Sequence, residues 1–129
     1  SLYAKISRCC ISSLNWRCKE AIFKNAAFRY VEFCYSDFSN ADLSNADLRN
    51  CSFVGAKLIG TVFIGSNLSN VDFSNAELYG SKFEGANLSN TNLKNAKNFD
   101  KNLHKDLKLC NTTMPDGTID NSNCDTKTQ

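Results

Sequence analysis

The stretch SDFSNADLSNADLRN, residues 36–50, repeats one five-residue pattern three times. In each unit the first residue is small, the third is Phe or Leu, and the fifth is Asn. The pattern continues on both sides, so that Ala21 to Asn95 divides into fifteen units whose third residue is always Phe or Leu. The fifth residue is Asn or Gly except in the units that end at Tyr30 and Tyr35. The fold must therefore be derived from a period of five.

A period of five fits neither an amphipathic helix, with its period of about 3.6, nor a strand, with its period of two. It suits a coil with one flat side per unit, in which the central Phe or Leu points inward beside the small first residue. Asn or Gly at the fifth position tolerates the positive φ that is common at tight corners. The predicted core ladder consists of Phe23, Phe28, Phe33, Phe38, Leu43, Leu48, Phe53, Leu58, Phe63, Leu68, Phe73, Leu78, Phe83, Leu88 and Leu93.

The units ADLSN and ADLRN, residues 41–50, resemble the consensus of the pentapeptide-repeat family. This resemblance implies an all-β solenoid, a right-handed quadrilateral β-helix with four pentapeptides per coil and about four coils. The sequence supports a coil of twenty residues by itself, because the larger first-position residues recur at that spacing: Val31, Cys51, Val71 and Thr91. The β-helix is expected over residues 21–97.

A second ladder with the same spacing is charged and faces outward. Its members alternate in sign: Asp37, Lys57, Glu77 and Lys97. Neighbours stacked about 4.8 Å apart would attract one another, whereas like charges would repel. Because an exposed pair contributes only a few tenths of a kcal/mol, we interpret the ladder as a control on the register of the coils.

The N-terminal residues 1–20 are predicted to cap the rod, because an uncapped solenoid exposes unpaired strand edges. Four apolar residues with helical spacing favour a short helix there: Leu2, Ile6, Cys10 and Leu14. The alternative is an irregular extra coil, because three residues fall on the register of the small first positions: Ile6, Ile11 and Trp16.

The C-terminal residues 98–129 are predicted as a second cap. Asn98 stands where Phe or Leu belongs, so the repeat ends there. Phe99, Leu103 and Leu107 then follow at intervals of four, which predicts a helix across the end of the rod.

The tail beyond this cap contains a hairpin signal. Pro115-Asp116-Gly117 predicts a turn between two short Thr-rich arms. Cys110 and Cys124 flank the hairpin, so a disulfide between them is a candidate clip. The segment TMPDGTI and the following Cys resemble the C-terminal segment of small pentapeptide-repeat proteins from cyanobacteria and the chloroplast thylakoid lumen. These relatives carry helical caps and sometimes a bracketing disulfide.

Seven cysteines in 129 residues indicate an oxidising compartment. With the resemblance of the tail, this predicts the thylakoid lumen or another oxidising extracytoplasmic location, with the cytoplasm as the alternative. Cys51 stands on an inward position and is predicted to be a buried thiol. Cys34 stands on an outward position and is a candidate free thiol, and Cys18 could form a bridge with Cys9 or Cys10. The start at Ser1 fits either a processed or an engineered N-terminus.

The composition excludes several classes of function. A net charge of +2 gives no global field to steer nucleic acid or an anionic membrane, and no apolar run is long enough to span a bilayer. His104, the single histidine, is expected to be solvated in the capping helix, with no nucleophile or carboxylate pair beside it. No CxxC spacing suggests zinc. The sequence therefore predicts no catalytic, metal or cofactor site, and no enzyme.

One outward strip is apolar. Ile59 and Tyr79 stack on one side, Phe99 would continue their line, and Val62 and Ile64 stand around the next corner. An exposed apolar strip can mark a contact surface, although the terminal caps are an alternative cover for it. The strip makes a protein partner the expected ligand, and no nucleic acid is expected.

The favoured function is a non-catalytic structural or protein-interaction module in a photosynthetic setting. The alternative is a DNA mimic that protects or inhibits a type II topoisomerase, as some pentapeptide-repeat proteins do. Such a mimic needs a strongly acidic rod. Residues 21–100 hold eight acidic and seven basic side chains, which argues against this alternative.

Overall fold

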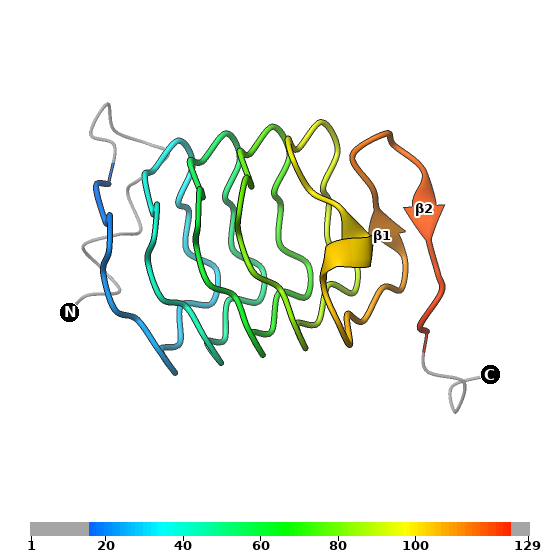
Figure 1. Ribbon diagram of the computed structural model, residues 1–129, viewed down its shortest axis with the longest axis horizontal. Helices are drawn as coiled ribbons and strands as arrows, with labels where there is room; N and C mark the ends of the chain where they lie inside the picture. The colour runs from blue at the N-terminus through cyan, green and yellow to red at the C-terminus, as the bar shows by residue number, and fades with distance from the viewer. Residues whose placement is uncertain (1–15, 125–129) are drawn as a thin grey trace.

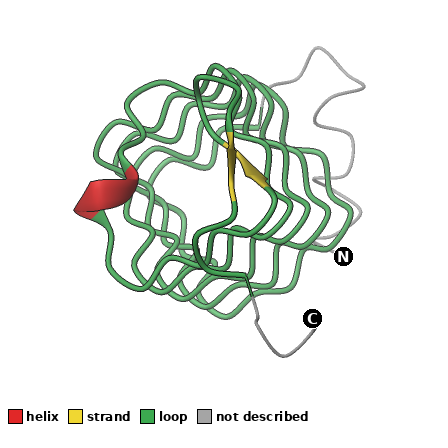
Figure 2. Cartoon of the chain, turned by 90° about the vertical axis from the view of Figure 1, so that its right-hand side faces the viewer, coloured by secondary structure: helices red, strands yellow, loops and turns green. Residues whose placement is uncertain are grey.

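The computed structural model describes residues 16–124, which wind into a rod of stacked coils (Figure 1). Viewed along the rod, the coils superimpose in a four-sided outline (Figure 2). Parallel β-bridges join residues twenty apart, from Arg17 and Asp37 at one end to Glu77 and Lys97 near the other. Each coil therefore consists of four sides of five residues.

Each side is held to the coils above and below by backbone hydrogen bonds. On the side 41–45, the Leu43 N–H donates to the Val62 carbonyl at 2.8 Å, toward the next coil. The Asp42 N–H donates to the Ala21 carbonyl at 2.9 Å, toward the previous coil. One bridge per side is all that the corners allow, so the rod contains a regular β-ladder although its sides are too short to count as strands.

The corners explain the fifth position of the repeat. The Ala46 N–H donates to the Leu43 carbonyl at 3.3 Å, and Asn45 between them has a φ of +55°. A turn with a positive φ at its third residue is a type II turn, which favours Gly or Asn there. Tyr30 and Tyr35, the exceptions to that preference, adopt the same backbone with φ of +62° and +59°.

Polar side chains at the first and second positions form hydrogen bonds with backbone N–H and carbonyl groups that the turns leave unpaired. At the second position, Asp42 Oδ1 accepts a hydrogen bond from the Ser44 N–H at 2.9 Å. At the first position, the buried Thr61 Oγ1 donates to the Phe38 carbonyl of the coil before it at 2.8 Å. Three further residues donate in the same way: Ser66, Thr91 and Thr112. The small first residue thus fills space beside the core and, at these four positions, bonds two coils together.

The interior is a column of the central side chains. Every central residue from Phe28 to Leu93 is buried, and Phe23 is half-buried at the N-terminal end. Phe53 lies nearly parallel to Phe33 and Phe73, with ring centroids 4.8 and 5.4 Å away. Rings stack within a ladder and meet edge to face between ladders, as Phe53 does with Phe63, so the column is filled by aromatic contacts.

The coil begins earlier than the repeat pattern indicated. Residues 16–20 form a side of the rod, because Arg17 bridges Asp37 and the Cys18 N–H donates to the Asp37 carbonyl at 2.7 Å. These residues therefore continue the coil, whereas the residues on which the N-terminal helix was predicted lie outside the described part of the chain. The remainder of the expected cap, including Leu2, lies outside the described residues.

The helix expected over Phe99–Leu107 is wrong. Among residues 16–124 the only helix is the single 3₁₀ turn η1, Lys101–Leu103, whose N-cap Asp100 accepts a hydrogen bond from the Asn102 N–H. Leu103 is 70% exposed and so does not cover the core, whereas Leu107 is buried. The helical spacing misled because these apolar residues belong to different local structures.

Two further sides follow η1, and the sequence pattern did not reveal them. Lys108 bridges Asn87 and Thr113 bridges Asn92, at a spacing of twenty-one instead of twenty. Leu109 is buried on the extra side, in line with Leu88, whose N–H donates to the Lys108 carbonyl at 2.9 Å. One inserted residue before Lys108 shifts the register, which hides these units from a fixed period of five.

A hairpin closes the C-terminal end. Strand β1, Thr112–Thr113, pairs antiparallel with β2, Ile119–Asp120, and the two lie at the end of the rod (Figures 1 and 2). The Gly117 N–H donates to the Met114 carbonyl at 2.8 Å, and Gly117 has a φ of +89°. This is the turn that the sequence Pro-Asp-Gly predicted.

A change in the volume of a side chain in the central column should lower the free energy of unfolding of the rod. Phe53→Ala is expected to lower the free energy of unfolding by about 3–5 kcal/mol, because the ring contacts aromatic neighbours above and below. Ala46→Leu, which adds volume to a full interior, is expected to cost about 1–3 kcal/mol. Urea unfolding followed by circular dichroism measures both, with the exposed Lys94→Ala as the control. Unchanged midpoints in both core variants would contradict the packing described here.

Candidate functional site

The sequence-predicted strip lies on two adjacent sides of the rod. Tyr79 is 66% exposed and Ile64 is 39% exposed, whereas Ile59 and Val62 are half-buried. Phe99 does not continue the line, since it packs against the end of the core with its ring edge toward Phe83. We use the name contact strip for Ile59, Val62, Ile64 and Tyr79.

Four corners beside the contact strip carry glycine, whereas most other corners carry asparagine: Gly60, Gly65, Gly80 and Gly85. Gly80 has a φ of +71°, a conformation that Asn adopts at equivalent corners. A Cβ at Gly80 would find no atom closer than the Gly60 nitrogen at 3.8 Å. Neither backbone geometry nor space therefore demands glycine at this corner. Gly80 and Gly85 therefore leave the backbone bare beside the exposed apolar residues, which permits close approach by another molecule, whereas the side chains of Asn40 and Asn45 occupy the space at Gly60 and Gly65.

The charge ladder runs along the side that carries Ile59 and Tyr79. Successive bridges align Arg17, Asp37, Lys57, Glu77 and Lys97, so the described ladder has one more member than the sequence indicated. Burial would raise the pKa of Asp37, but hydrogen bonds from Ser39 and the charge of Lys57 outweigh it and lower that pKa. The neighbouring Lys57 thus helps to keep Asp37 ionised.

The cysteines divide into structural classes. Cys51 is buried, its Sγ donates to the Phe28 carbonyl, and burial raises the pKa of the thiol to about 12, so that it stays protonated. Cys34 is disulfide-bonded, so the expectation of a free thiol at that position is wrong. The expected bridge to Cys18 involves Cys9 or Cys10, which lie outside the described residues.

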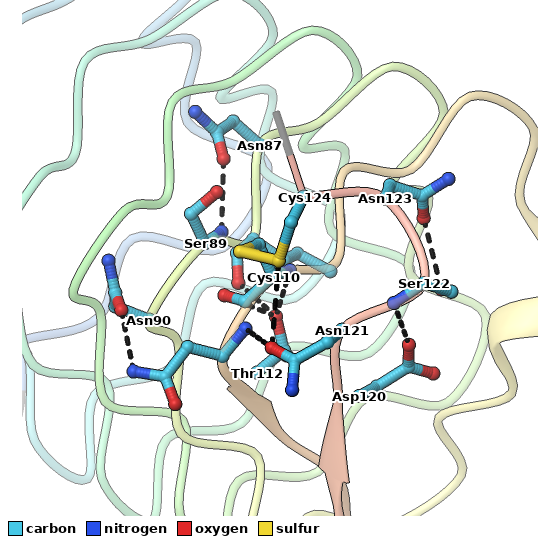
Figure 3. Close-up of a disulfide and its surroundings, with 12 residues drawn as sticks. Asn87, Ser89, Asn90, Cys110, Thr112, Asp120, Asn121, Ser122, Asn123 and Cys124 are labelled. Atoms are coloured by element: carbon cyan, nitrogen blue, oxygen red, sulfur yellow. Dashed lines mark hydrogen bonds between the residues drawn. A yellow bond between two sulfur atoms is a disulfide. The ribbon is translucent and has the colours of Figure 1, made fainter. Parts of the chain in front are cut away.

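A disulfide joins Cys110, just before β1, to Cys124 beyond β2 (Figure 3). Two hydrogen bonds hold the surrounding segment: the Asn111 N–H donates to Asn121 Oδ1 at 2.6 Å, and the Asn123 N–H donates to the Leu109 carbonyl at 2.9 Å. The tail is therefore fastened across the last coil by both covalent and polar contacts.

His104 does not occupy the solvated helical position expected for it. Its side chain is only 8% exposed, and its ring stacks on Phe99 with centroids 5.6 Å apart. The Phe83 N–H donates to Nδ1 at 3.4 Å, and Glu84 Oε2 lies 3.5 Å from the same nitrogen. Sequence reasoning missed this carboxylate because twenty residues, one full coil, separate it from the histidine.

The described residues offer little for chemistry. No group of three or more His, Cys, Asp or Glu side chains within residues 16–124 is placed to hold a metal ion. The main hollow is an open depression of about 370 Å³ at the C-terminal end, with Phe99, Met114 and Pro115 among its lining residues. In the part of the chain that the structure describes, no helix is both long and apolar enough to cross a membrane.

The comparison with protein families now decides the identity of the fold. The family model described as a pentapeptide repeat region matches residues 26–103. This chain belongs to the pentapeptide-repeat family. Its coil is accordingly the right-handed quadrilateral β-helix that characterises the family.

Solved pentapeptide-repeat structures share this fold. One from the Arabidopsis thaliana thylakoid lumen aligns with a TM-score of 0.67 and 20% identity, over 76% of this chain and 68% of the other. Rfr23 from the cyanobacterium Cyanothece 51142 aligns with 24% identity and a TM-score of 0.40, over 75% of this chain and 63% of Rfr23, so this chain spans less than two thirds of Rfr23. No curated protein matches this pentapeptide-repeat chain. The likeness to the Arabidopsis thaliana protein shows the fold alone and leaves the function open.

The tail of the pentapeptide-repeat protein should loosen in acid. Lys101 Nζ lies 2.7 Å from Asp120 Oδ2, and this bond, with those from Ser122, lowers the pKa of Asp120 to about 2. A lowered carboxyl pKa contributes stability that is present above the ordinary value of 3.8 and is lost as the pH falls through about 2. Lys101→Met should therefore raise the pKa of Asp120 toward 3.8, as measured by carboxyl NMR titration. Lys94→Met is the control, and equal Asp120 titrations in both variants would contradict the pairing.

Proposed function

We propose that this pentapeptide-repeat protein is a non-catalytic interaction module that docks a protein partner on the contact strip. The observation that carries the proposal is the combination of outward apolar side chains with glycine corners beside them. Tyr79 and Ile64 present their side chains to solvent, and Gly80 and Gly85 leave the backbone accessible at their corners. A partner gains both apolar area and unobstructed main-chain groups there.

The energetics favour a small contact anchored by the tyrosine. Burial of an exposed aromatic side chain is among the larger single contributions to an interface, and tyrosine adds a hydroxyl that bonds at the rim. Other sides of the rod offer polar residues at the equivalent outward positions, such as Ser69 and Ser89 in place of Tyr79. The contact strip therefore offers a partner more apolar area than these polar sides of the rod do.

We propose further that the protein works in an oxidising extracytoplasmic compartment of a photosynthetic organism, such as the thylakoid lumen. The disulfide between Cys110 and Cys124 supports an oxidising home, as does the disulfide-bonded state of Cys34. The likeness to the Arabidopsis thaliana lumen protein is a likeness of fold and is consistent with this setting.

Substitution within the contact strip should weaken the binding of a partner. The double variant Ile59→Ser, Tyr79→Ser is expected to bind any specific partner at least tenfold more weakly, since loss of one anchor costs about 1.4 kcal/mol or more. The measurement is a pull-down from the native compartment, followed by titration of the captured protein against each variant. Gly80→Asn should also weaken binding, because it restores a side chain to the bare corner.

The matched control is Val54→Ser, which makes the same kind of apolar-to-polar change on a different side of the rod. Binding should survive this change. If a partner is retained equally by wild type, the double variant and the control, the contact strip is not its docking surface.

The competing hypothesis is a DNA mimic that acts on a type II topoisomerase. The alternating ladder opposes it, because Lys57 and Lys97 interrupt the acidic side chains Asp37 and Glu77 along one side. A DNA mimic needs continuous negative charge to compete with a phosphate backbone. We expect neither inhibition nor protection in a gyrase supercoiling assay at low and physiological salt. Inhibition that saturates with added protein would favour the mimic over the interaction module.

A further inference from the structure

The backbone ladder of one side is completed at the C-terminal end by a side chain. On the side that contains Phe23, Phe63 and Phe83, the amide of each central residue donates to a backbone carbonyl of the next coil, as Phe63 does to Lys82 at 2.7 Å. The chain turns into η1 before it can supply that carbonyl to Phe83. His104 Nδ1 takes its place and accepts from the Phe83 N–H at 3.4 Å.

The same nitrogen faces a second group that requires the opposite role. Glu84 Oε2 lies 3.5 Å from His104 Nδ1, and a carboxylate can only accept a hydrogen bond. An Nδ1 without a proton can accept a hydrogen bond from the Phe83 N–H, whereas an Nδ1 that carries a proton can donate one to the Glu84 carboxylate. Within the described residues the other carboxylate oxygen, Glu84 Oε1, is buried and has no hydrogen-bond partner. One nitrogen therefore has two partners that it cannot satisfy in one protonation state.

We propose that His104 is a proton-controlled latch at the C-terminal end of the rod. In the neutral state the imidazole completes the ladder by accepting from the Phe83 N–H. Protonation places a proton on Nδ1, breaks the Phe83 bond, and forms a charged hydrogen bond with Glu84. Histidine is the side chain that proteins commonly use for exchanges of this kind, because its imidazole can either accept a hydrogen bond or carry a positive charge.

The surroundings of the ring admit either state. Phe99 stacks on the imidazole and offers a π-face to an imidazolium, and Phe83 meets the ring edge-on at 5.4 Å. Besides Glu84, the charged residues around the histidine are Lys101 and Asp106, which line the same hollow at the end of the rod, and Lys105 beside it in sequence. The charges of Lys101 and Asp106 act on the imidazole in opposite directions. Glu84 is the charged group in direct contact with the imidazole.

The latch couples proton binding to the exposed end of the core. Phe99 and His104 cover Phe83, the last buried ring of its ladder, and Phe99 also lines the hollow beside Met114. Release of the Phe83 amide removes one of the hydrogen bonds that tie the segment around His104 to the last full coil. The Gly85 N–H, which donates to the Lys105 carbonyl at 2.9 Å, remains as the neighbouring backbone tie.

The test follows amide signals of the whole chain by ¹⁵N NMR between pH 8 and 5. The Phe83 amide should shift along the same curve as the His104 ring, and its hydrogen-exchange protection should fall at least tenfold relative to the Phe63 amide in the same sample. Comparison with Phe63 cancels the intrinsic pH dependence of exchange. A Phe83 amide whose shift and relative protection ignore the His104 titration would overturn the latch.

Two variants separate the latch from a merely structural role. His104→Gln keeps an acceptor without a titratable group, so the Phe83 amide should become independent of pH. Glu84→Gln removes the partner of the imidazolium, so its urea midpoint relative to wild type should be lower at pH 5 than at pH 8. An equal difference at both pH values, or a Phe83 response that persists in His104→Gln, would refute the exchange. The wild-type titration decides the question even if a variant fails to fold.

Discussion

The inward column of one Phe or Leu from every five residues is the interaction on which the whole rod depends. Each of these side chains is buried by its neighbours in the coils above and below, so no coil is stable alone. The narrow width of the column fixes the size of the first residue, and the tight corner fixes the backbone of the fifth. Three of every five positions are therefore assigned by packing and turn geometry before any function is considered.

The backbone ladder reinforces the column because it is satisfied at every level. Turns, second-position carboxylates and amides, and first-position hydroxyls take up groups that a side of five residues leaves unpaired, as Asp42 does for Ser44 and Thr61 for Phe38. At the ends of the rod no further coil supplies these hydrogen-bond partners. At the C-terminal end a histidine, a hairpin and a disulfide take the place of the next coil, so the residues that differ most from the repeat lie there.

The interior could be predicted from sequence because a strict period of five admits few structures. At the C-terminal end the hairpin turn and the disulfide could be predicted, but the path of the chain between them and the last repeat could not, for two physical reasons. A single inserted residue before Lys108 changes the spacing of the last bridges, so the buried Leu109 and Thr112 fell outside any fixed pattern. Phe99, Leu103 and Leu107 have helical spacing by coincidence, and only the three-dimensional path shows that one faces solvent while another is buried. The contact of His104 with Glu84 likewise depends on a full coil of intervening chain.

Function in such a rod is left to the two outward positions of each unit and to the corners. Those positions carry no packing constraint, so departures from the common Ser, Asn and charged residues need a cause outside the fold. Ile64 and Tyr79 depart toward apolar side chains, and Gly80 departs from Asn although Asn suits the same backbone. The three departures lie on two adjacent sides of the rod. These solvent-exposed changes, which the rod does not need, are the physical reason for the proposal that a partner binds there.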